Sequence, residues 1–105
     1  MNPTLVENLR RQIDGPRDGA LLRFSLANAL HAAGDVAAAA ESCRAALAFD
    51  PDYSAAWKLL GKLCVELDDT AGAIAAYERG IAAAARRGDK QAQKEMSVFL
   101  KRLRR

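Results

Sequence analysis

The sequence predicts an all-α fold, an α–α superhelix of about six antiparallel helices. Apolar residues recur at intervals of three and four, as at Leu60, Leu63 and Leu67, which is the spacing of a helix face rather than of a strand. Half of the 105 residues are hydrophobic, yet few of these are β-branched or aromatic, a mixture that favours closely packed helices. One sequence template also occurs twice at an interval of 34 residues, which indicates a stacked helical repeat.

The first three expected helices span residues 3–13, 19–33 and 36–49. The Asp-Gly-Pro run at 14–16 ends the first of them, because glycine and proline interrupt a helix. The second has Asp18 as its N-cap and ends at Gly34. Asp35 caps the third, and Pro51 stops it because proline disfavours a helical conformation in the preceding residue.

The last three expected helices span residues 53–67, 70–86 and 89–104. Asp68 ends the first of these, and Thr70 is the expected cap of the next. Gly88 separates the last two helices, and Asp89 begins the final one. Every connection is short, so successive helices are expected to run antiparallel within a single domain, residues 1–105.

The template repeated after 34 residues matches small residues with small ones and large apolar residues mostly with large ones. Leu26, Ala27, Ala39, Cys43 and Pro51 in the first copy correspond to Leu60, Gly61, Ala73, Tyr77 and Ala85 in the second. We therefore expect one repeat at 19–51 and another at 53–87. The helix at 3–13 fits the second half of a truncated unit. The helix at 89–104 fits the first half after a two-residue insertion, and we expect it to cap the stack.

These residues resemble the pattern of the tetratricopeptide repeat, W-x-x-L-G…A-x-x-x-[FY]. The second copy carries it as Trp57, Leu60, Gly61, Ala73 and Tyr77. The first copy departs at Arg23, where the family often has tryptophan. Cys64 replaces a common tyrosine, and Gly80 a common alanine. The resemblance implies about two full repeats plus flanking helices, and a non-enzymatic protein–protein interaction module.

The resemblance also implies a concave groove, lined by the first helix of each unit, that takes a peptide or a helix of a partner. The expected groove residues are Phe24, Asn28 and His31 in the first unit and Lys58, Lys62 and Val65 in the second. Spacings of four and three place each trio on one helix face. The two lysines lead us to expect an acidic partner segment. A carboxylate clamp for chaperone termini is not expected, because Phe24 and Leu59 replace a basic residue and an asparagine of that site.

Catalytic and metal-binding readings find little support. His31 is the sole histidine, which excludes a multi-histidine metal site. Cys43 and Cys64 occupy apolar positions of helical patterns, as buried thiols do. Gly61-Lys62 lacks the earlier glycine and the Ser/Thr of a phosphate loop. We expect no enzymatic activity and no cofactor.

Basic residues accumulate toward the C-terminus. Residues 54–105 contain eleven basic and six acidic side chains, a net charge of +5. The late cations are Arg86, Arg87, Lys90, Lys94, Lys101, Arg102, Arg104 and Arg105. An alternative function is therefore binding of nucleic acid or an anionic surface by the last helix. The scarcity of aromatic residues available for base stacking disfavours nucleic acid.

Another alternative is a self-associating structural module, since a short stack leaves apolar ends. Leu5, Val6 and Leu9, or Phe99 and Leu103, would form that contact, giving a monomer or a weak homodimer. No run of 18 apolar residues occurs, and residues 1–15 contain no apolar core of a signal peptide. We therefore expect a cytoplasmic protein without a membrane segment.

Overall fold

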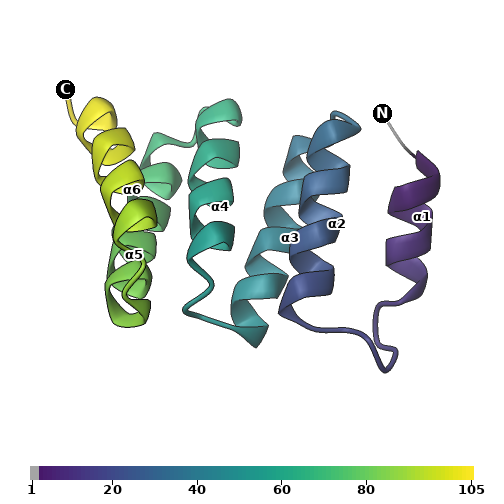
Figure 1. Cartoon of the computed structure of the whole chain (residues 1–105). Helices are drawn as coiled ribbons and strands as arrows, with labels where there is room; N and C mark the ends of the chain where they lie inside the picture. Colours follow the sequence, from purple (N-terminus) through teal and green to yellow (C-terminus); the bar gives the residue numbers. More distant parts are fainter. Residues whose placement is uncertain (1–2) are drawn as a thin grey trace.

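The computed structural model describes residues 3–105 and arranges them as six helices with no strand in that range (Figure 1). The helices are α1 (Pro3–Arg11), α2 (Ala20–Ala32), α3 (Val36–Phe49), α4 (Ser54–Glu66), α5 (Thr70–Arg87) and α6 (Lys90–Leu103). The all-α prediction is confirmed, and each helix ends within two residues of its expected bounds. The division of the chain into a half-repeat, two repeats and a capping helix stays a prediction.

The helices stand side by side in a row from α1 at one end to α6 at the other (Figure 1). Helix α2 packs along α3, α4 packs along α5, and α6 packs against α5. Contacts between α3 and α4 join the two hairpins, and α1 rests on α2. The molecule measures 40 × 28 × 18 Å, so it is an elongated slab in which each helix meets mainly its neighbours in the chain.

Small residues set the close spacing inside each hairpin. Ala27 and Ala39 are fully buried between α2 and α3, and Ala73 is fully buried in α5. A Cβ atom at Gly61 would overlap the ring of Tyr77, at 2.6 Å from its Cζ. Helices approach this closely only where side chains at the crossing are small.

Close packing explains why residue 80 is glycine, where the family commonly has alanine. A Cβ atom there would lie 2.7 Å from Cβ of Trp57 and would overlap Sδ of Met96. The missing methyl group therefore leaves room for Met96 to reach from α6 into the space between α4 and α5. Met96 is fully buried at that point.

Aspartates begin three of the helices. The carboxylates of Asp35, Asp69 and Asp89 accept hydrogen bonds from the backbone N–H three residues later, at 3.1, 2.9 and 3.1 Å. The prediction of Thr70 as a cap was wrong, because Asp69 takes that role and Thr70 is the first residue of α5. Each cap satisfies a backbone donor that would otherwise lack a partner in the first helical turn.

The prediction of Asp18 as the cap of α2 was also wrong, since Gly19 occupies that position. Asp18 instead accepts two hydrogen bonds from Arg23, both at 2.8 Å, and two from the backbone N–H groups of Asp14 and Gly19, both at 2.9 Å. These bonds fasten the loop between α1 and α2 to the first turn of α2. The Arg23 guanidinium holds the pKa of the Asp18 carboxyl well below its usual range.

We expect the Asp18–Arg23 pair to make the free energy of unfolding depend on pH in the acid range. The pKa of Asp18 is lower in the folded chain than its ordinary value of 3.8. The pair therefore stabilises the fold fully above about pH 5, and this stabilisation is lost as the pH falls below about 4. Urea midpoints of wild type and Asp18→Asn should differ most near neutral pH and converge in acid. Glu7→Gln, at an exposed residue without an ion pair among residues 3–105, is the control and should follow wild type throughout. A constant gap between wild type and Asp18→Asn would contradict the assignment.

Helix length and composition also bear on membranes. None of the helices formed by residues 3–105 is both long enough and apolar enough to cross a lipid bilayer.

Candidate functional site

A groove of about 1000 Å³ runs along the face formed by α2, α4 and α6. The six residues predicted from the sequence all line it: Phe24, Asn28, His31, Lys58, Lys62 and Val65. The first trio lies on α2 and the second on α4, where spacings of three and four keep each trio on one helix face. The prediction that this face binds a partner stays a prediction.

Helix α6 supplies a wall that the sequence analysis did not assign to the groove. Phe99, Arg102 and Leu103 line it from α6, and Leu59, Glu66 and Tyr77 contribute from α4 and α5. Shifting Lys58, Lys62 and Val65 by the 34-residue period plus the two-residue insertion gives Lys94, Val98 and Lys101 instead. The buried residues Ala92, Met96 and Leu100 correspond to the buried Ala56, Leu60 and Cys64 at this offset, so α6 keeps the orientation of the repeat and lines the groove with another edge of the helix. The apolar pair Phe99 and Leu103, four residues apart, was the available signal.

Aromatic contacts strengthen the apolar part of the groove. The ring centroids of Phe24 and Tyr53 lie 5.0 Å apart, and those of Tyr77 and Phe99 lie 5.6 Å apart, both in tilted arrangements. Tilted aromatic pairs at this separation are favourable beyond the burial of their area. Burial also raises the pKa of the Tyr77 phenol, so this residue is neutral at physiological pH.

A hydrogen bond between His31 and Glu66 and an ion pair between Lys58 and Glu95 connect neighbouring helices across the groove surface. Nε2 of His31 lies 2.9 Å from Oε2 of Glu66 and links α2 to α4. Nζ of Lys58 lies 3.4 Å from Oε1 of Glu95 and links α4 to α6. Three of the predicted residues are thus already engaged within the chain, because the Asn28 side chain also donates a hydrogen bond to the carbonyl of Phe24, at 3.2 Å.

Two cations on the groove differ from the others. Lys62 on α4 and Arg102 on α6 are exposed and line the groove, and neither forms an ion pair with an acid among residues 3–105. The groove surface therefore carries positive charge that the described chain does not neutralise.

The two cysteines lie in the core, and the histidine contacts a carboxylate. Cys43 and Cys64 are free thiols that are buried in the core, and burial raises the pKa of Cys43 to about 12. A thiol with so high a pKa is a poor nucleophile, since the thiolate is the reactive form. His31 pairs with Glu66, and residues 3–105 contain no group of three His, Cys, Asp or Glu side chains placed to hold a metal ion.

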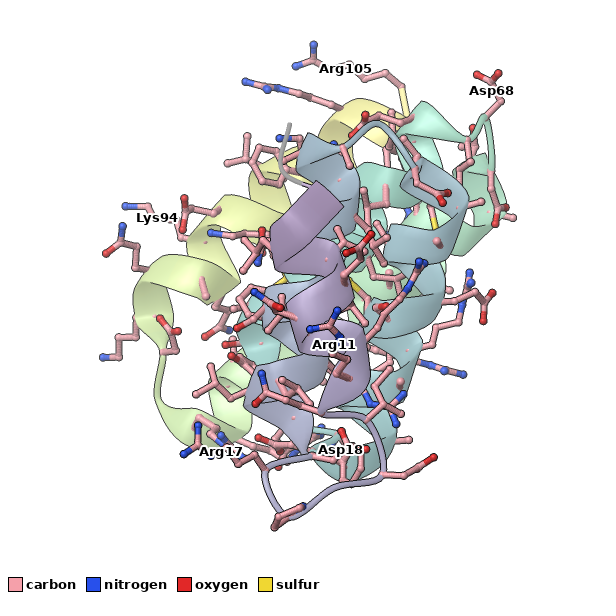
Figure 2. All side chains as sticks on the ribbon, turned by 90° about the vertical axis from the view of Figure 1, so that its right-hand side faces the viewer. Arg11, Arg17, Asp18, Asp68, Lys94 and Arg105 are labelled. Carbon is pink, nitrogen blue, oxygen red and sulfur yellow. The ribbon has the colours of Figure 1, made fainter. Side chains whose placement is uncertain are left out.

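Arg102 lines the groove, and the other late basic residues divide into two groups. Arg86 pairs with Asp52 at 2.6 Å, Arg87 with Asp50 at 2.7 Å, and Arg104 with Glu78 at 2.5 Å. Lys90, Lys94, Lys101 and Arg105 are exposed on α6 and after it, outside the groove. Figure 2, viewed from the α1 end, shows Lys94 and Arg105 extending away from the helices. The alternative of an anionic partner for this surface stays a prediction.

Most of the residues expected to drive self-association pack within the fold of the chain itself. Val6 is buried, and Leu9, Phe99 and Leu103 are half-buried and pack against core residues. Leu5 is 43% exposed. The oligomeric state stays a prediction.

Comparisons with known proteins agree with the helical repeat. A family model described as tetratricopeptide repeat matches residues 30–94. The chain is 48% identical over 99 residues to the TPR repeat-containing protein PA0015 of Pseudomonas aeruginosa, covering 94% of each sequence. It is similar to the solution structure of protein BPP2914 from Bordetella parapertussis, with 46% identity and a TM-score of 0.79 over 94% of this chain and 86% of that one. It is also similar to the Sgt2 TPR domain from Aspergillus fumigatus, with 26% identity and a TM-score of 0.71 over 91% and 66% of the two chains.

The duplicated template, the paired helices and the matching family model lead to one conclusion. The chain belongs to the tetratricopeptide repeat family, whose members are generally non-enzymatic protein–protein interaction modules.

Proposed function

We propose that this protein is a cytoplasmic adaptor that binds a segment of another protein in the groove between α2, α4 and α6. The observation that carries the proposal is the convergence of the six sequence-predicted residues on a single mostly apolar groove of about 1000 Å³. This volume lies at the upper end of the range for small-molecule sites, which suits a stretch of polypeptide.

The chemistry of the groove favours recognition rather than reaction. Apolar side chains from three helices supply contact area, and polar groups at their edges supply orientation. The bound segment is acidic in this proposal, because Lys62 and Arg102 offer positive charge and Lys58 lies beside them on the same surface. The protein works as a monomer or a weak homodimer.

Site-specific photo-crosslinking in the source cell tests where the partner binds. A photoreactive amino acid replaces Asn28 or Val65, which are exposed and line the groove, or Ala82, which is exposed on α5 outside it. We expect the same partner to be crosslinked from positions 28 and 65 and not from 82. Exposed positions are chosen because substitutions there rarely change stability by more than about 0.5 kcal/mol. Equal crosslinking from all three positions, or from 82 alone, would refute the proposal.

A further inference from the structure

We infer that the segment bound in the groove is an amphipathic α-helix with carboxylates beside its apolar stripe, held by Lys62 and Arg102. This inference rests on the proposed function and specifies the partner's chemistry. Three features of the groove carry it: its apolar lining, its shortage of hydrogen-bond acceptors, and its two cations without an acidic partner in the described chain.

The apolar lining comes from two neighbouring helices, α4 and α6. Leu59 and Val65 line it from α4, and Phe99 and Leu103 line it from α6. Val65 remains 44% exposed, so it offers apolar surface for a partner to cover. A helix with apolar residues at positions i, i+3, i+4 and i+7 presents a continuous stripe of matching shape.

The polar groups of the groove are poorly suited to an extended segment. An extended chain brings one backbone N–H and one C=O for nearly every residue, and burying these without partners is costly. Lys62 and Arg102 only donate hydrogen bonds. Of the side-chain acceptors on the described lining, the Glu66 carboxylate is shared with His31, and the amide oxygen of Asn28 stays open because only its nitrogen is engaged, with Phe24. Few acceptors therefore remain on the described lining for peptide N–H groups. A helix satisfies its own backbone, so an apolar groove receives it without that penalty.

The ion pairs of the chain decide which charge the partner needs. Glu66 is paired with His31 and Glu95 with Lys58, so the acids near the groove are engaged. Lys62 lies on α4, the middle helix of the groove, and Arg102 on the neighbouring α6, and neither has an acid partner among residues 3–105. Carboxylates beside an apolar stripe would meet Lys62 near the middle of the groove and Arg102 on α6. A basic or neutral helix would leave both cations uncompensated.

Three synthetic peptides of equal length test the inference by fluorescence anisotropy. The first repeats leucine at i, i+3, i+4 and i+7 with glutamate on both flanks of the stripe. The second has the same sequence except for a central proline, which breaks the helix. The third replaces the glutamates with lysines. We expect the acidic helical peptide to bind and to gain helical circular dichroism on binding, and the other two to bind at least about tenfold more weakly.

Two charge-matched variants of the protein locate the contact. Lys62→Glu/Arg102→Glu should weaken binding of the acidic peptide at least about tenfold, because like charges then face each other. Lys90→Glu/Lys94→Glu changes the net charge equally on the side of α6 outside the groove, and should leave binding within about twofold of wild type.

Each contrary outcome has a distinct meaning. Equal binding of the proline peptide would overturn the helical occupant, and equal binding of the lysine peptide would overturn the charge assignment. Loss of binding in Lys90→Glu/Lys94→Glu would place a polyanion on the outer side of α6. Dimers that dissociate in Lys62→Glu/Arg102→Glu and resist the peptides would make a second copy the occupant. Binding of none of the peptides overturns the inference, while groove-specific crosslinking of a cellular partner would still support the proposed function.

Discussion

Gly61→Leu should lower the free energy of unfolding by up to about 3 kcal/mol, the upper part of the range for overpacking a core. Even the first carbon of a side chain at this position would lie 2.6 Å from Cζ of Tyr77. Tyr77 is only 4% exposed and its ring packs on Phe99, so room for the new side chain is made only by displacing packed groups or by separating α4 from α5. Urea denaturation followed by circular dichroism measures the loss.

Gly19→Leu is the matched control for this prediction. No atom lies within 4 Å of a Cβ built at Gly19, and its φ of 165° is extended backbone that any residue adopts. The control should therefore lose no more than about 1 kcal/mol, the usual cost of replacing a favoured N-cap residue. If Gly61→Leu left the midpoint where Gly19→Leu leaves it, the close packing of α4 on α5 would be refuted.

Met96→Ala should destabilise the fold by about 2–5 kcal/mol and also weaken binding in the groove. Met96 is fully buried, and it fills the space that Gly80 leaves open between α4 and α5. Removing it leaves a cavity under α6, the helix that carries Phe99, Arg102 and Leu103 to the groove. Denaturant melts give the first effect, and anisotropy with the acidic helical peptide gives the second.

Two other substitutions separate packing from general damage to α6. Met96→Leu keeps most of the volume and should cost less than about 1.5 kcal/mol. Val98→Ala removes carbon atoms from a residue that is 43% exposed, so it should change stability by no more than about 0.5 kcal/mol. A loss in Val98→Ala as large as that in Met96→Ala would mean that Met96 does not anchor the helix.

Most of the fold was predictable because signals at several levels coincide. Asp35 and Asp69 are 34 residues apart and cap equivalent helices, so the local cap and the repeat period predict the same boundaries. The error at Thr70 arose where two residues with good capping side chains are adjacent. Asp18 was misplaced because its carboxylate has a partner five residues later in Arg23, which outcompetes the helix end.

The groove was predictable on α2 and α4 and not on α6. The two repeat copies match without insertion, so a face found on α2 transfers to α4 at the same spacing. Helix α6 keeps the buried face that the template gives it, but it lines the groove with a different edge from the one that carries the trio on α4. Arg102 was therefore grouped with the late cations by composition alone. The pairing of Arg86 with Asp52, 34 residues away, also depends on how the hairpins stack, which one sequence does not reveal.

The contacts His31–Glu66 and Lys58–Glu95 join neighbouring helices at the surface of the groove. Both lie where water reaches them, so each is worth no more than about 1 kcal/mol. They span successive units of the array and add to the core packing between α3 and α4 that joins the two hairpins. Rising ionic strength weakens these contacts. If the groove binds the acidic helix inferred above, salt would act on the complex twice, once on the charges of the partner and once on the contacts that join the helices of the groove.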